Sequence, residues 1–186
     1  MARTKKLSDD VVLDTALALI HGRGPDRLTF ASLAEASGLS PATLVQRFKG
    51  RAELMQAALL RAWDQLDAKT SSLAVKTPRT PEGAVALLVG LSGSYGGIDD
   101  YAEGLLVLRE DFRDPLLRAR GAQWKAVLTA ALDDCFATLP NAPEGVGLLM
   151  ASHWQGSLLW WAFEPDDRLD VYVNRSLDRF VEALLR

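Results

Sequence analysis

A run of nineteen residues near the C-terminus, 145–163 (GVGLLMASHWQGSLLWWAF), carries no formal charge and constrains the fold more strongly than any other stretch. It is long enough to span a bilayer. However, polar side chains interrupt it between residues 152 and 157, and glutamates flank it instead of the lysines and arginines that anchor membrane helices. We therefore predict a helix buried on several sides of a soluble protein, with no membrane partner.

Apolar residues recur at three- and four-residue spacing along almost the whole chain, a pattern that predicts amphipathic helices. Ser8, Thr29 and Ser40 precede three such segments as candidate N-caps, and glycines and prolines mark the ends of the segments. No stretch shows the alternation that is typical of strands. We expect an all-α fold with helices over residues 8–22, 29–37, 40–48 and 50–68, and then over about 83–95, 99–112, 115–138, 144–163 and 167–185.

Residues 69–83 (KTSSLAVKTPRTPEG) contain prolines and small polar residues, which predicts a linker between two parts of the chain. Charge is also distributed unevenly along the sequence. The first 61 residues carry nine Lys/Arg against six Asp/Glu, whereas the remainder carries twelve against eighteen. A basic N-terminal part ahead of an acidic remainder suits an anionic partner at the N-terminal end.

The sequence offers no set of residues for catalysis or metal binding. One cysteine, Cys135, and two histidines, His21 and His153, are too few for a structural metal site, so we expect no metal and no cofactor. The glycine-rich segment 90–97 has no preceding strand and no following Lys-Ser/Thr, unlike a phosphate-binding loop. We expect a protein that is not an enzyme, and the lone cysteine fits the reducing cytoplasm.

Residues 29–48 have the pattern of a helix-turn-helix: two short helices joined by a turn that contains Gly38. Leu44 and Phe48 would anchor the second helix to the first. Its opposite face offers small or uncharged side chains and one arginine, as a helix that enters a DNA major groove requires. Thr43 can contact a thymine methyl group or a phosphate, Gln46 can pair with adenine, and Arg47 can reach guanine or a phosphate.

Residues 28–59 (LTFASLAEASGLSPATLVQRFKGRAELMQAAL) resemble the DNA-binding segment of the TetR (tetracycline repressor) family of bacterial transcription regulators. The C-terminal two-thirds is similar to that family only in layout, through "REDFRDPLLRAR" and two final helices joined at "FEPDD". The resemblance implies nine helices, with a helix-turn-helix domain over residues 1–50. It also implies a ligand-binding and dimerisation domain over residues 69–186, joined to the first by helix four.

The resemblance carries expectations for individual DNA-contacting residues. Lys49 matches a phosphate-contacting lysine of the family, at a helix start where an anion is favoured. Val45 replaces a common tyrosine and Pro41 a frequent lysine, which indicates an unusual operator or a modest affinity. A basic arm precedes the first helix. The predicted contacts are Arg3, Lys5, Lys6, Thr29, Pro41, Ala42, Thr43, Val45, Gln46, Arg47 and Lys49.

All five tryptophans lie beyond the helix-turn-helix, which predicts an effector pocket walled by aromatic side chains. The same rings could instead form the core or a dimer interface. The predicted ligand-binding residues are Tyr95, Tyr101, Arg109, Trp124, His153, Trp154 and Gln155. The resemblance places the dimer interface on the last two helices, where the candidates are Leu158, Trp161, Val173, Leu177, Phe180, Val181 and Leu184.

Together these features predict a ligand-responsive repressor. It would bind a palindromic operator on double-stranded DNA as a homodimer and would be released by a small, largely apolar or aromatic molecule. The alternative is a helical module that binds small molecules or proteins and whose helix-turn-helix is only structural. A steep dependence of DNA affinity on salt concentration would distinguish the first from the second.

Overall fold

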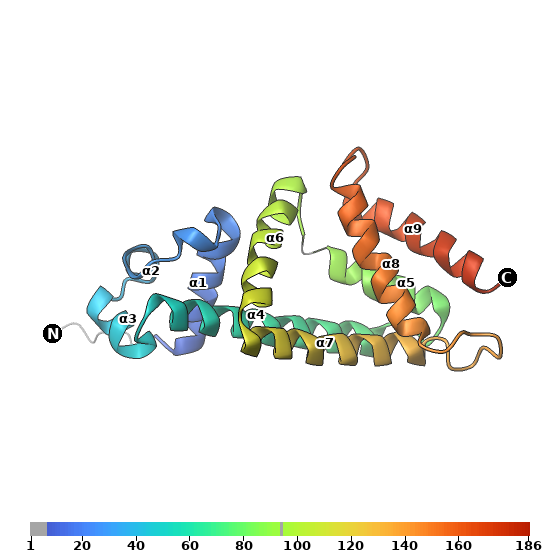
Figure 1. Cartoon of the computed structure of the whole chain (residues 1–186), viewed down its shortest axis with the longest axis horizontal. Coiled ribbons are helices and arrows are strands. Elements are labelled where there is room, and N and C mark those ends of the chain that lie inside the picture. Colours follow the sequence, from blue (N-terminus) through green and yellow to red (C-terminus); the bar gives the residue numbers. More distant parts are fainter. Residues whose placement is uncertain (1–6, 94) are drawn as a thin grey trace. The chain divides into compact units, whose positions relative to one another are not determined.

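The computed structural model describes residues 7–93 and 95–186. Within these ranges the chain forms nine α-helices and a short 3-10 helix, η1, and no strand (Figure 1). The all-α prediction is therefore confirmed. The helices are α1 (Asp9–Arg23), η1 (Pro25–Arg27), α2 (Phe30–Ser37), α3 (Pro41–Phe48), α4 (Arg51–Lys76), α5 (Pro81–Ser92), α6 (Ile98–Arg113), α7 (Pro115–Asp134), α8 (Val146–Trp161) and α9 (Leu169–Leu184).

Side-chain caps explain why several helices begin where they do. The Ser8 hydroxyl accepts a hydrogen bond from the Val11 amide at 3.4 Å and caps α1. Thr80 does the same for α5, through the Gly83 amide at 3.3 Å. Such caps satisfy backbone donors that have no partner inside the helix. None of the helices in the described part of the chain is long and apolar enough to cross a membrane.

The predicted linker over residues 69–83 is wrong in its first half, because α4 continues as helix to Lys76. Thr70 shows why the small polar residues misled. Its side chain is fully buried, its hydroxyl donates to the Leu66 carbonyl at 2.8 Å, and the Trp124 indole donates to that hydroxyl at 3.0 Å. A polar residue whose hydrogen bonds are made inside the protein is compatible with a buried helix.

The chain divides into two compact units. The head unit comprises Met1–Gln65 with Ala102–Gly121, and the body unit comprises Leu66–Tyr101 with Ala122–Arg186. The boundaries fall inside α4, α6 and α7, so each of these helices contributes to both units. The division into a DNA-binding domain and a ligand-binding domain concerns function, and it stays a prediction.

The head unit is built around one apolar core. Side chains from α1, α2, α3 and the start of α4 are buried together, and one residue of α7 joins them. The core residues are Val12, Ala16, Leu17, Ile20, Leu28, Leu33, Leu44, Phe48, Leu54, Ala58, Leu59 and Leu117. Burial of this apolar surface is the main force that holds the short helices together.

In the body unit, α8 and α9 pack against each other, and α5 packs against α9. The uncharged run predicted to be buried forms α8, and its Trp154 is only 1% exposed. The start of α8 lies directly on α7: the Gly147 amide donates to the Asp133 carboxylate at 2.7 Å. A Cβ at Gly147 would collide with the Thr129 carbonyl oxygen of α7, so only glycine fits this crossing.

We expect Gly147→Ala to lower the free energy of unfolding by about 1–3 kcal/mol, because the backbone oxygen that blocks the methyl group cannot rotate away. Gly104→Ala is the matched control. Gly104 lies inside α6 with no heavy atom within 4 Å of a built Cβ, so alanine there should stabilise by roughly 0.5–1 kcal/mol. Urea unfolding followed by circular dichroism measures both. Equal stability of the two variants would contradict the close crossing.

Candidate nucleic-acid interface

The α2–α3 pair forms a helix-turn-helix in the head unit. Gly38 ends α2 with a φ of 72°, a left-handed conformation that glycine adopts without steric cost. Leu33 of α2 and Leu44 of α3 are fully buried, and both belong to the head core. One face of each helix is therefore fixed to the protein, and the outer face of α3 is left exposed.

The start of α2 is fixed by a reciprocal pair of hydrogen bonds. The Thr29 hydroxyl accepts from the Ser32 amide at 3.0 Å, and the Ser32 hydroxyl accepts from the Thr29 amide at 3.0 Å. This capping box holds the exposed Thr29 at a helix start, where the helix dipole favours an anion. Thr29 is therefore placed in surroundings that suit a phosphate.

The outer face of α3 consists of short or uncharged side chains. Pro41, Ala42, Val45 and Gln46 are exposed, and Thr43 is half-buried with its hydroxyl 2.8 Å from that of the N-cap, Ser40. Of these side chains, the Gln46 amide is the one that can form two hydrogen bonds with an adenine edge, one as donor and one as acceptor. The exposed placement agrees with the predicted roles, which remain predictions.

Arg47 is engaged within the protein. Its Nη1 donates to the Leu7 carbonyl at 2.8 Å and lies 3.2 Å from the Asp9 carboxylate, and its side chain is only 20% exposed. These contacts join the end of α3 to the start of α1. Sequence reasoning assigned Arg47 to DNA and could not find them, because the acceptors are nearly forty residues away.

The connection between α3 and α4 is strained at Lys49. This residue has a φ of 62° and a ψ of −63°, and the Gly50 amide donates across it to the Phe48 carbonyl at 2.7 Å. The geometry is that of a γ-turn with positive φ, which is rare and strained in proteins. In the described ranges Lys49 is the only residue other than glycine with a positive φ. Strain of this kind concentrates at functional sites.

Arg51 is a residue of this region that sequence reasoning missed. It begins α4, where its Nε donates to the Leu28 carbonyl at 2.9 Å and its Nη2 to the Pro25 carbonyl at 3.0 Å. The side chain thus ties the start of α4 to the segment before α2. No sequence signal identifies such a contact, because the acceptors are backbone carbonyls. The predicted basic arm, Arg3, Lys5 and Lys6, lies outside the described residues.

The predicted effector residues do not form one cluster. Arg109 belongs to the head unit and is exposed, whereas the other six belong to the body unit. The indoles of Trp124 and Trp154 donate to Thr70 and Ser92 within the body core. His153 stacks on Phe180 of α9 at 4.3 Å, and Gln155 is exposed.

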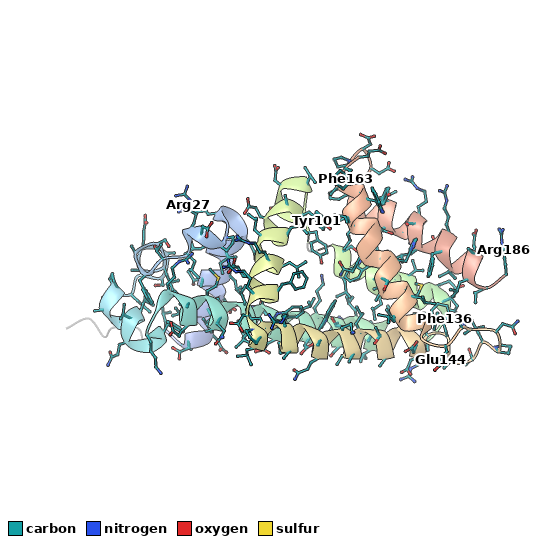
Figure 2. The ribbon with its side chains drawn as sticks, in the orientation of Figure 1. Arg27, Tyr101, Phe136, Glu144, Phe163 and Arg186 are labelled. Atoms are coloured by element: carbon teal, nitrogen blue, oxygen red, sulfur yellow. The ribbon has the colours of Figure 1, made fainter. Side chains whose placement is uncertain are left out.

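Two of the predicted effector residues, Tyr95 and Tyr101, do lie together. Their ring centroids are 5.6 Å apart at 74°, and Tyr101 also meets Trp161 edge-on at 6.2 Å. Figure 2 labels Tyr101 near the start of α6. Burial, and to a smaller extent the neighbouring Tyr101, raises the pKa of the Tyr95 phenol to about 12. This aromatic cluster is the part of the predicted effector site that the structure brings together.

The predicted dimer residues are mostly covered within the single chain. Four of these side chains are buried: Leu158, Trp161, Val173 and Leu177. Three more are half-buried: Phe180, Val181 and Leu184. A partner would therefore contact mainly the exposed side chains of α8 and α9, with Phe180, Val181 and Leu184 only partly accessible. Trp160 of α8 is 67% exposed, and Phe163, which follows α8 (Figure 2), is 72% exposed.

Comparison with known proteins agrees with this geometry. Residues 12–58 match the family model of the bacterial regulatory proteins, tetR family. A search of curated proteins gave no match. The matched segment contains α2, the turn and α3 in full, together with most of α1 and the start of α4.

Solved structures share the fold over nearly the whole chain. The TetR-family regulator PfmR from Thermus thermophilus has 19% identity and a TM-score of 0.64, over 94% of this chain and 99% of its own. A tetR-family regulator from Streptomyces coelicolor has 22% identity and a TM-score of 0.68, over 92% and 79%. A transcriptional regulator from Saccharomonospora viridis, in complex with choline, has 20% identity and a TM-score of 0.72, over 92% and 93%. The DNA-binding segment is therefore similar to that of the tetR family of bacterial regulatory proteins, and the chain shares the fold of these solved regulators.

Proposed function

We propose that the protein is a cytoplasmic repressor that binds a palindromic operator as a homodimer and releases it when a small molecule binds. The observation that carries the proposal is the outer face of α3. It presents exposed short side chains and one amide, while the opposite face is buried through Leu44 and Phe48. A major groove accepts a helix with such a face, because the backbone can come close to the base edges.

Selection of preferred duplexes from a random pool tests this function directly. A repressor should enrich a palindrome whose half-sites are about 34–36 Å apart or a multiple of that distance. Its affinity should fall steeply as salt concentration rises, because phosphate contacts release counterions. A module that binds only small molecules or proteins would enrich no sequence, and that result would exclude the proposal.

Gln46 should read one base pair. Replacing it by alanine should relax the preference at a single position of each half-site and cost roughly 1–3 kcal/mol of discrimination, if the amide pairs with adenine in two hydrogen bonds. Competition between duplexes that differ at one position measures this. Ala42→Ser is the matched control on the same exposed face, and it should leave that position unchanged. Unchanged selectivity in Gln46→Ala would remove Gln46 from the readout.

Lys49 should lower the stability of the protein through its strained backbone and raise its affinity for DNA through its charge. Because its positive φ is strained, Lys49→Gly should raise the free energy of unfolding by roughly 1–3 kcal/mol. The same change removes a cation, so it should weaken binding to all duplexes about equally and reduce the salt dependence. Chemical unfolding and binding across a salt series measure the two effects. Lys49→Ala separates them, because it removes the charge but keeps the strain.

For the dimer we propose a face on which α8 and α9 are both accessible. His153 of α8 and Phe180 of α9 stack there, and an open groove beside them is lined by Tyr172, Ser176 and other α9 residues. Leu149, Gly156 and Trp160 lie at helical spacing from His153 and therefore share its face of α8. A surface of this kind, with a large exposed indole, is typical of a protein interface.

A Trp160→Glu variant should sediment as a monomer at micromolar concentration and should lose operator binding, because one head contacts too few bases. Leu159→Glu is the matched control: Leu159 is 45% exposed on α8 but lies on another side of the helix. Analytical ultracentrifugation of both variants measures the effect. Dimers formed by Trp160→Glu and monomers by Leu159→Glu would move the interface to the other side of α8.

For the effector we propose a small, largely apolar or aromatic molecule that binds in the body unit near Tyr95 and Tyr101. The aromatic cluster supports this, because rings that meet edge to face offer large rigid surfaces to a ligand. The structural neighbour that holds choline adds a quaternary ammonium to the compounds worth testing, since aromatic faces bind such cations. An effector must bind the DNA-competent and incompetent forms with unequal affinity.

A further inference from the structure

The corner between α6 and α7 is part of the head unit. Leu117, in the first turn of α7, is 2% exposed and lies in the same apolar core as Leu44 of α3. Asp114 caps α7, and the Gln56 amide of α4 donates to its second carboxylate oxygen at 2.7 Å. The corner is therefore attached to α4 through Asp114 and, through Leu117, to the apolar core that also contains Leu44 of α3.

Within this corner, Asp111 of α6 is a buried carboxylate. It is 8% exposed, and the Trp63 indole of α4 donates to its Oδ1 at 3.0 Å. Burial raises the pKa of the Asp111 carboxyl, the Trp63 hydrogen bond lowers it, and the neighbouring Asp114 carboxylate raises it again. The net direction is upward, so the ionised form of Asp111 is disfavoured in the folded protein.

The Trp63 ring also packs on α7. A Cβ built on Gly121 would lie 3.1 Å from the indole, so the ring packs directly on the backbone of that glycine. Nearby, Arg120 of α7 and Asp64 of α4 form an ion pair at 3.1 Å, in which the Asp64 side chain is 63% exposed. The indole of Trp63 thus contacts both helices of the corner, α6 through Asp111 and α7 through Gly121.

Joining two helices through a buried carboxylate costs free energy. Desolvation penalises the charge, and an apolar side chain of similar volume often serves stability equally well. Buried carboxylates with raised pKa are accordingly more frequent at functional sites. The position of Asp111 indicates its role. Asp111 joins α6 to α4, α6 is followed directly by α7, and Leu117 of α7 belongs to the core that also contains Leu44 of α3.

We propose that Trp63 and Asp111 are positioning residues for DNA binding. Their hydrogen bond fixes the α6–α7 corner and thereby the position of the apolar core on which α3 packs. The proposal rests on the repressor function proposed above. Neither residue needs to contact DNA. When the bond is lost, the corner shifts, Leu117 repacks, and α3 presents its outer face in the wrong position.

The test compares Asp111→Asn with Asp111→Leu on the enriched duplex. Asparagine keeps an acceptor oxygen opposite the indole and should bind the operator as the wild type does. Leucine keeps the approximate volume but removes the acceptor, and its affinity should fall roughly fivefold or more, within the usual range of coupling between sites. The operator affinity of Trp63→Phe, which lacks the donor, should fall by a similar factor. Affinities are expressed per folded molecule, from stoichiometric titration at a temperature below unfolding.

A pH series gives a second readout. Because the pKa of Asp111 is raised in the folded state, wild-type stability should fall relative to Asp111→Asn as pH rises from the ordinary aspartate range through the raised value. Glu144→Leu removes an exposed carboxylate outside the corner and should leave operator affinity unchanged.

Two results would overturn the proposal and are distinct from each other. Wild-type affinity in folded Asp111→Leu and Trp63→Phe would show that the pair serves stability alone. Failure of the wild-type protein to bind any duplex would instead remove the repressor function on which the proposal rests.

Discussion

An eight-residue helix is too short to be stable by itself in water, so α3 depends entirely on the side chains that it buries. Leu44 and Phe48 supply that burial, and the Ser40 hydroxyl caps the first turn by accepting from the Thr43 amide at 3.1 Å. The exposed side chains on the outer face, such as Val45 and Gln46, are then not needed to stabilise the helix. This division of labour within one short helix is what allows small, uncharged groups to face outward without loss of stability.

The remaining contacts of the head unit hold that helix in place. Arg47 joins its end to α1, Arg51 joins the next helix to the segment before α2, and Leu117 fills the core from α7. Each contact links segments that are far apart in sequence. The head is therefore more than three local helices and a turn: its geometry is set by residues as distant as the α6–α7 corner.

Local patterns in the sequence predicted the helices well, because N-caps, prolines and apolar spacing act within a few residues of one another. The caps at Ser8, Thr29 and Ser40 all occur in the structure. What these patterns missed has long-range causes. The sequence around Thr70 predicts a linker, because its hydrogen-bond partner Trp124 is distant in sequence. The ion pair of Arg47 with Asp9 likewise cannot be predicted from the sequence of α3 alone. Apolar stripes on α8 and α9 cannot by themselves show which side faces the protein's own core.

The hydrogen bond from the Gly147 amide of α8 to Asp133 of α7 has a consequence for the entropy of folding. Asp133 and Gly147 are only fourteen residues apart, so the contact between α7 and the start of α8 closes a short loop at small entropic cost. The bond between Ser92 and Trp154 spans sixty-two residues, so it closes a longer loop at greater cost. Ordering the start of α8 on α7 therefore costs less chain entropy than ordering α8 on α5.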